Sequence, residues 1–209
     1  MIKSFNLLGT LNIIKAGRSA MNRQCKLNDE AKAYLNRFYY ILDNMIQGMT
    51  TAELSDSISY NFMVQMIPHH RAAIEMSENI LEYTNNSTLE SIARNIIKEQ
   101  TESIANMESI MCSCMEVTNS VRCLNIYQCR MDKIMQQMFC RMDHACASNR
   151  IDCNFLWEMI PHHMGAVEMS QTTLMFDICP ELKPILEAII SSQKRGIMQM
   201  RQLEQCLKC

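Results

Sequence analysis

Apolar side chains recur every three or four residues through most of the chain after residue 31. This spacing puts them on one side of a helix with 3.6 residues per turn, so residues 32–50 are predicted to form an amphipathic helix. The capping-box pattern TTAE at 50–53 predicts the start of a second helix, and STLE at 87–90 predicts a third. The first apolar stripe consists of Leu35, Phe38, Leu42, Met45 and Met49.

The same pattern occurs twice along the chain. The segment MIPHHRAAIEMS at 66–77 returns as MIPHHMGAVEMS at 159–170, an offset of 93 residues. Two tandem copies of three helices each are therefore predicted, and two copies are too few for a solenoid. Positions that match at the same offset outside this segment include Met45 with Met138, Met49 with Met142, Asn61 with Asn154 and Gln100 with Gln193.

A hairpin of two amphipathic helices cannot bury both apolar faces by itself, but two such hairpins make a four-helix bundle. We therefore predict an all-α fold, a four-helix bundle built from two duplicated helical units with one additional helix per unit. The additional helix is expected to pack outside the bundle or across its end. The predicted organisation is an N-terminal leader at 1–31, a first helical repeat at 32–116 and a second at 120–209, with both repeats packed into one domain.

Composition supports long helices and raises a question about methionine. The 209 residues include 5 Gly and 4 Pro, roughly a third of the usual combined share of about 12%. There are 20 Met against 6 Phe, 6 Tyr and 1 Trp. The methionine thioether is soft and flexible, so it either fills gaps in a core or binds soft metals.

Charge and hydropathy limit the classes of partner and the cellular locations that fit this protein. A formal net charge of −2 offers no basic surface for nucleic acid. No apolar run reaches the ~20 residues of a membrane span. Residues 1–20 carry no clean cleavage pattern of a signal peptide, so a cytoplasmic location is the default and export to the cell envelope or periplasm stays open.

Eleven cysteines are unevenly placed, since Cys25 alone precedes residue 112. The uneven distribution favours reduced, buried cysteines over a disulfide framework. Two short motifs, C-x-C at 112–114 and C-x-x-C at 206–209, leave metal binding or crosslinks between chains open.

The two histidine doublets are the strongest chemical signal. Helical spacing places Met66, His69, His70 and Met76 on one broad face, whereas Glu75 falls on the far side. The second copy repeats this face with Met159, His162, His163 and Met169, and Glu168 again lies opposite. Imidazole with thioether suits copper, and Cu(I) better than Cu(II), while zinc is left open. The remaining methionines at helical spacing are read as core.

A proline precedes each doublet, at Pro68 and Pro161, in mid-helix. Proline there removes one backbone hydrogen bond and costs about 3 kcal/mol. A kink that turns the two histidines toward one point, or that frees a carbonyl group, is the expected reason.

Other chemistries lack their motifs. Neither copy has the Glu-x-x-His pair of di-iron bundles, and the His-Glu-x-x-His of zinc proteases is absent. No substrate pocket or proton-transfer partner is indicated, so the chain is not expected to be an enzyme, and a copper-cycling redox enzyme ranks last.

The motif F-[ML]-x-x-M-I-P-H-H-x-x-A-[IV]-E-M, followed by a helix with I-I-x-x-Q and a Met seven residues after the Gln, resembles a bacterial family catalogued as domain of unknown function 305. The resemblance covers both copies. It implies a ferritin-like all-α fold, and some members of the family are similar to periplasmic copper-binding proteins. The residues to which it assigns a metal role are Met66, His69, His70, Met76, Met159, His162, His163 and Met169.

The chain departs from this family at acidic positions. Asp152 keeps an acid three residues before the Phe of the second helix, but Ser59 replaces it in the first copy. Ser103 and Gly196 stand where family members often have Glu. If those acids orient the histidines, metal binding is expected to be weakened or altered here.

Two functions follow from these patterns. The leading one is a metal-binding protein that buffers, stores or delivers copper, with the metal ion as its partner. The alternative is a cysteine-rich structural or assembly protein, a homo-oligomer joined through cysteine or helix packing.

Overall fold

The computed structural model describes residues 27–145 and 147–209, and within these ranges it consists of helices joined by short loops, without strands. The all-α prediction is confirmed. Residues 1–26 of the predicted leader lie outside the described residues, and the first described helix begins at Asp29. The helices are α2 (Asp29–Thr50), α3 (Ile58–Leu81), α4 (Ser87–Met115), α5 (Val121–Asp143), α6 (Ile151–Thr173) and α7 (Leu182–Leu207).

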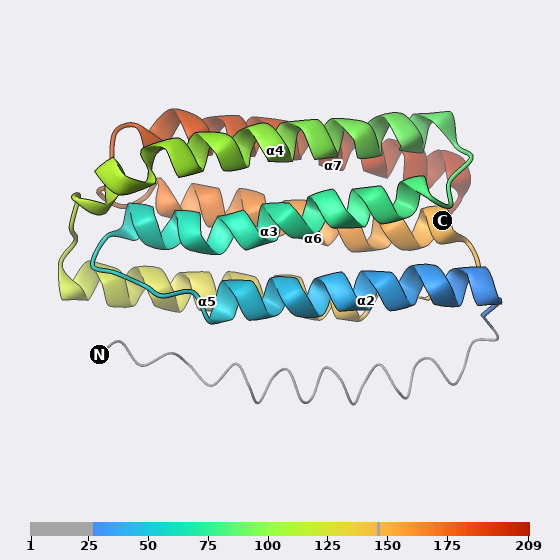
Figure 1. Cartoon of the computed structure of the whole chain (residues 1–209), viewed down its shortest axis with the longest axis horizontal. Coiled ribbons are helices and arrows are strands. Elements are labelled where there is room, and N and C mark those ends of the chain that lie inside the picture. Colours follow the sequence, from blue (N-terminus) through green and yellow to red (C-terminus); the bar gives the residue numbers. More distant parts are fainter. Residues whose placement is uncertain (1–26, 146) are drawn as a thin grey trace.

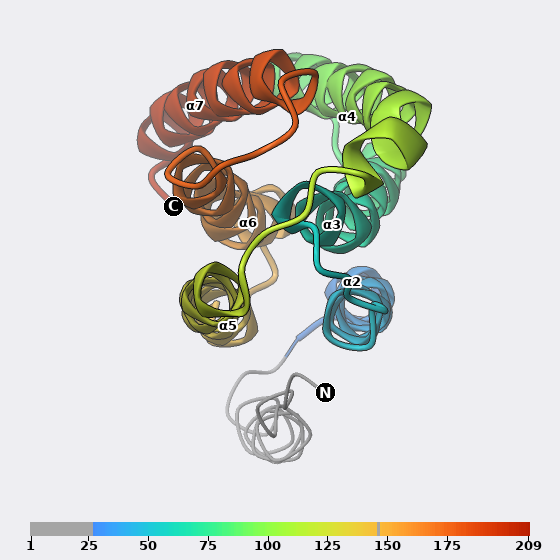
Figure 2. The ribbon, with the colours of Figure 1, turned by 90° about the vertical axis from the view of Figure 1, so that its left-hand side faces the viewer.

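Four helices form the central bundle. Helix α3 contacts α4, α4 contacts α7, α7 contacts α6, and α6 contacts α3, which closes the ring seen end-on in Figure 2. Helices α2 and α5 pack on the outer sides of α3 and α6 (Figure 1). The first half of the chain (α2 to α4) and the second half (α5 to α7) thus have the same order of helices and the same internal contacts.

Two asparagines at corresponding positions of the two halves form hydrogen bonds to the loops that lead into α3 and α6. The Ser55 N–H donates to Asn61 Oδ1 at 2.7 Å, and Asn61 Nδ2 donates to the Ser55 carbonyl at 3.0 Å. In the second half the Ser148 N–H donates to Asn154 Oδ1 at 3.0 Å, and Asn154 Nδ2 donates to the Ser148 carbonyl at 2.8 Å. The repeated asparagine therefore fixes how each doublet-bearing helix enters the bundle.

The predicted start of the second helix at residue 50 is wrong. Thr50 is the last residue of α2, and its hydroxyl donates back to the Ile46 carbonyl at 2.7 Å. Helix α3 begins at Ile58, where Ser57 Oγ accepts a hydrogen bond from the Tyr60 N–H. The predicted capping residue therefore lies inside the preceding helix, and Ser57 caps α3 instead.

The two mid-helix prolines leave their helices continuous: Pro68 lies inside α3 and Pro161 inside α6. Pro68 packs against Gly48 of α2, where a Cβ atom would come within 2.8 Å of the Pro68 Cβ. Glycine at position 48 therefore allows α2 to lie against the ring of the proline that directly precedes the first histidine doublet in sequence.

Methionine fills much of the core. Besides the four methionines among the site candidates, buried methionines lie on α2, α4, α5 and α7. The helical spacing of such methionines in the sequence predicts that they belong to the core. Gly165 on α6 leaves the space that the Met138 side chain of α5 occupies. The corresponding residue in the first half is Ala72, so this close approach belongs to the second half.

Replacing Gly165 by alanine is expected to lower the free energy of unfolding by about 1–3 kcal/mol, because the new methyl group overlaps Met138. Chemical denaturation measures the effect. In a Met138→Ala background the same substitution should be neutral or stabilising, since alanine is the better helix former by about 1 kcal/mol. An equal cost in both backgrounds would contradict this packing.

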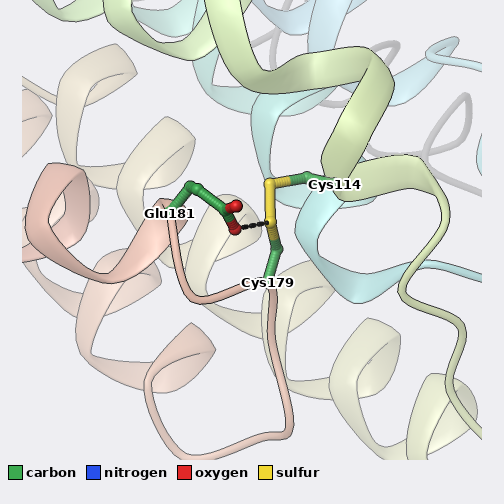
Figure 3. A group of neighbouring side chains, drawn as sticks. All are labelled: Cys114, Cys179 and Glu181. Atoms are coloured by element: carbon green, nitrogen blue, oxygen red, sulfur yellow. Dashed lines mark hydrogen bonds between the residues drawn. A yellow bond between two sulfur atoms is a disulfide. The ribbon is translucent and has the colours of Figure 1, made fainter.

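Four cysteines form two disulfides, which corrects the expectation of reduced cysteines. Cys114 at the end of α4 is bonded to Cys179 in the α6–α7 loop (Figure 3), and Cys153 of α6 is bonded to Cys209. The partners are 65 and 56 residues apart, so neither C-x-C nor C-x-x-C pairs within itself. The bundle brings these helix ends together, which spacing along the chain does not reveal.

The described cysteines outside the disulfides lie at or near the surface. Cys112, Cys129, Cys140 and Cys206 are exposed, and Cys123 is half-buried. None of the described helices is long and apolar enough to cross a membrane.

Candidate metal centre

The two histidine doublets meet where α3 and α6 contact each other at the centre of the bundle. The His69 and His162 rings stack with their centroids 3.7 Å apart and their planes 30° from parallel. The ring centroids of His70 and His69 are 5.9 Å apart, and those of His163 and His162 are 6.0 Å apart. Ring contacts thus connect the four imidazoles in the order His70, His69, His162, His163, and this set is called here the histidine row.

Hydrogen bonds at the row define which nitrogen atoms are free. His162 Nε2 lies 3.2 Å from the backbone carbonyl oxygen of His69. A carbonyl can only accept, so Nε2 carries the proton and His162 Nδ1 keeps a lone pair. At one end of the row, His70 Nε2 lies 3.0 Å from Ser103 Oγ.

Most of the other ring nitrogens are buried without a partner. Both nitrogens of His69 lack a hydrogen bond to any described residue, and so does Nδ1 of His70, His162 and His163. Buried polar atoms are normally hydrogen-bonded, because leaving one unpaired costs about 1–3 kcal/mol. A neutral imidazole has one nitrogen with a lone pair, which is the atom that binds a metal ion. The four adjacent imidazoles therefore offer buried ligand atoms to a metal ion.

Burial also keeps the row neutral. It lowers the pKa of His70 and of His163 to about 3. Burial, together with repulsion from the neighbouring imidazoles, lowers the pKa of His69 and His162 well below the usual value. A metal ligand must be unprotonated, so the imidazoles are in the ligand form at neutral pH.

Acid is expected to destabilise the metal-free protein through these histidines. A histidine with a folded pKa near 3 stabilises the fold fully above its unfolded pKa of about 6.5. That contribution is lost as the pH falls from about 6.5 towards 3, because the unfolded chain binds the proton first. Each such histidine contributes up to about 1.4 kcal/mol per pH unit. Denaturant unfolding at pH 7.5 and pH 5 measures the change.

A His70→Gln variant isolates this effect, and its unfolding free energy should vary less between the two pH values than that of the wild type. The comparison is needed because burial raises the pKa of Glu158 well above its usual range, which acts in the opposite direction. His144→Ala, which removes an exposed imidazole at the end of α5, serves as the control substitution. Equal pH dependence in wild type and His70→Gln would refute the assignment.

The four predicted thioether ligands are buried on the two helices that carry the row. Met66 and Met76 are buried on α3, and Met159 and Met169 are buried on α6. The two acids predicted to face away do so: Glu75 pairs with Arg37 of α2 at 3.4 Å, and Glu168 approaches Arg141 of α5 at 3.8 Å. All eight candidate residues are thus on α3 and α6.

The ligand atoms of the four imidazoles do not gather at one point. Among the described residues, no three imidazole ligand atoms lie within 4.8 Å of one another. One ion therefore contacts two imidazoles at most in this arrangement, and thioether sulfur would have to complete its coordination. Imidazole and thioether are borderline and soft donors, a set that fits copper.

Among the described residues, three ligand-type atoms come close together only at Cys114, Cys179 and Glu181 (Figure 3). The two sulfur atoms are bonded to each other, and Glu181 Oε2 lies 2.9 Å from Cys179 Sγ. A disulfide offers no thiolate, so this group is no metal site in its oxidised form.

The replaced acids give the two ends of the row different surroundings. Ser103, in place of a Glu, supplies the hydroxyl beside His70 Nε2. At the matching position Gly196 lets α7 approach closely, since a Cβ there would lie 3.0 Å from His163 Cδ2. Ser59 accepts a hydrogen bond from the Cys179 N–H at 2.8 Å and so supports the disulfide-bearing loop.

Sequence reasoning missed a buried carboxyl on one of the helices that carry the row. Glu158 precedes Met159 in α6 and accepts a hydrogen bond from Tyr34 Oη of α2 at 2.9 Å. Its counterpart at the 93-residue offset is Gln65, so comparison of the two copies held the signal: one half has an acid where the other has a neutral amide.

Within the described residues, the fold has six helices, and two of them, α3 and α6, carry the buried histidines together with buried methionines. The chain belongs to the family described as domain of unknown function DUF305, whose profile matches residues 59–204. No curated protein matches the chain.

Solved structures of a protein named CopM share the fold. CopM in a silver-bound form is 28% identical, with a TM-score of 0.54, over 70% of this chain and 94% of CopM. CopM in its Cu(I)-bound form is 26% identical, with a TM-score of 0.53, over 74% of this chain and 99% of CopM.

Proposed function

We propose that this protein binds copper at the histidine row. The observation that carries the proposal is the set of buried, neutral imidazole nitrogens without hydrogen-bond partners. Nothing else among the described residues satisfies them, and a soft cation would. The CopM structures support the choice of metal, since that protein is similar over most of its length and has been captured with Cu(I) and with silver.

The proposed ligands form one site in each half of the chain. His69 and His70 act with Met66 and Met76 on α3, and the corresponding set on α6 is His162, His163, Met159 and Met169. Copper supplies no reaction in this proposal: it is the cargo. We favour Cu(I), because thioether sulfur prefers the softer ion, and copper over zinc, because neither thiolate nor exposed carboxylate lies in the row.

We propose buffering, storage or delivery rather than catalysis. The chain's own residues keep the imidazoles unprotonated, shield them from water and hold both doublets at a fixed separation. These properties favour retention and exchange of an ion over turnover of a substrate.

Anaerobic titration against a chromophoric Cu(I) chelator tests the proposal. Exposed thiols must first be alkylated, because free cysteines also bind Cu(I). We expect at least one chelator-resistant Cu(I) per half, with Zn(II) held more weakly. Protein that surrenders all its Cu(I) to the chelator would refute the proposal.

We also propose that the protein works in an oxidising compartment such as the cell envelope, the location that the sequence left open. Two disulfides that close long loops are typical of exported proteins and rare in the cytosol. Alkylation of thiols in intact cells, followed by mass spectrometry, should find Cys114 and Cys153 protected. If both are alkylated, the protein resides in a reducing compartment.

Assembly through cysteine remains the second candidate function. The observation that favours it is the set of exposed thiols on three different helices, at Cys112, Cys129 and Cys206. Non-reducing electrophoresis of native protein should then show a ladder that collapses with reductant. A single monomer band would count against it.

A further inference from the structure

A cleft of about 390 Å³ between α4 and α7 reaches one end of the histidine row. His70 forms part of its lining, although its ring is buried. Ser103, which also lines the cleft, is half-buried and lies 3.0 Å from His70 Nε2. An ion cannot cross a packed apolar core, so it needs an opening with polar side chains to reach the row. This cleft has polar side chains from both helices and ends at His70.

The inner part of the cleft presents oxygen atoms that lack partners. Gln100 of α4 and Gln193 of α7 both line it, and both side chains are buried. The Oε1 atom of each has no hydrogen-bond partner among the described residues. These two glutamines correspond at the 93-residue offset, so each half contributes one unsatisfied acceptor to the same opening.

The mouth of the cleft is charged. Glu99 and Glu102 of α4 and Arg195 of α7 line it, and all three are exposed. Arg195 Nη2 lies 3.2 Å from Glu99 Oε1, so this ion pair joins the two helices across the opening. Glu102 forms no ion pair with a described residue and leaves the mouth a negative charge that attracts cations.

We propose that this cleft is the route by which the metal ion reaches and leaves the histidine row. The proposal rests on the proposed function. Glu102 attracts the cation, the amide oxygens of Gln100 and Gln193 replace part of its water, and His70 Nε2 then binds it in place of the Ser103 hydroxyl. The Arg195–Glu99 pair joins the helices across the mouth, and the guanidinium of Arg195 repels the incoming cation.

Stopped-flow loading of alkylated protein with Ag(I) tests the route, because silver undergoes no redox change under these conditions and the exposed thiols are blocked. The single tryptophan, Trp157, lies two residues before Met159 on α6 and serves as the fluorescent reporter. At low ionic strength Arg195→Gln should load about threefold faster, and Glu102→Gln about threefold slower. Equilibrium affinity should stay within about twofold, and the rate differences should shrink at high salt.

The Arg71–Glu108 pair provides matched controls. It joins α3 to α4 with the same 3.2 Å separation, is exposed, and lies outside the cleft lining. Arg71→Gln and Glu108→Gln should load at the wild-type rate. Wild-type rates in the cleft variants, or equal shifts in the controls, would overturn the route while leaving the metal site intact. Failure of the wild type to retain Ag(I) against a chelator would instead refute the proposed function.

Discussion

Replacing His70 and His163 together by alanine is expected to weaken Cu(I) binding by at least about 100-fold. Loss of a partner that merely orients a ligand already costs about 10–100-fold in metal affinity, and here a direct ligand is removed from each half. Chelator competition with alkylated protein measures the change. Each doublet keeps one histidine, so residual weak binding is expected.

Two comparisons separate ligand loss from general damage. His144→Ala removes an exposed imidazole at the end of α5 and should leave Cu(I) affinity unchanged. Met66→Leu with Met159→Leu keeps the side-chain volume but removes both thioethers, so affinity should fall while stability changes little. Unchanged Cu(I) affinity in the double histidine variant, with its helices intact, would show that the row is not the site.

Reduction of the two disulfides is expected to lower the free energy of unfolding by several kcal/mol. Each bond closes a loop of 56–65 residues, for which loop entropy predicts about 4 kcal/mol. Together they join the end of α4 to the α6–α7 loop and the start of α6 to the C-terminus. Guanidinium denaturation with and without a dithiol reductant measures the loss.

Serine pairs assign this loss to each bond. Cys114→Ser with Cys179→Ser, and Cys153→Ser with Cys209→Ser, should each destabilise the oxidised protein by roughly 2–5 kcal/mol. Cys129→Ser removes an exposed, unbonded thiol and should have little effect. Identical unfolding of oxidised and reduced wild type would mean that the bonds do not form in solution.

The helical layout was predictable because it depends on local periodicity. The apolar stripe of residues 32–50 and the doublets on one face of their helices require only the 3.6-residue turn, and both agree with the structure. The start of α3 was not predictable from TTAE, because α2 continues through Thr50, whose hydroxyl donates to the Ile46 carbonyl, and the residue that caps α3 is Ser57.

Relations between the two halves were harder to predict. Repetition suggested two separate doublets, but nothing in the spacing says that His69 and His162 stack. The same holds for Cys114 and Cys179, which meet only because the bundle closes. Glu158, in contrast, could have been noticed in the sequence, because the corresponding residue of the first half is the neutral Gln65 and a buried acid is unusual.

X-ray absorption at the copper edge is the most direct test of the central claim. It should be recorded on Cu(I)-loaded protein in which the exposed cysteines have been replaced by serine. The histidine row with its neighbouring methionines predicts both imidazole nitrogen and thioether sulfur bound to copper, with no more than two imidazoles per ion. Copper bound by oxygen alone, or by sulfur without any imidazole, would contradict the account.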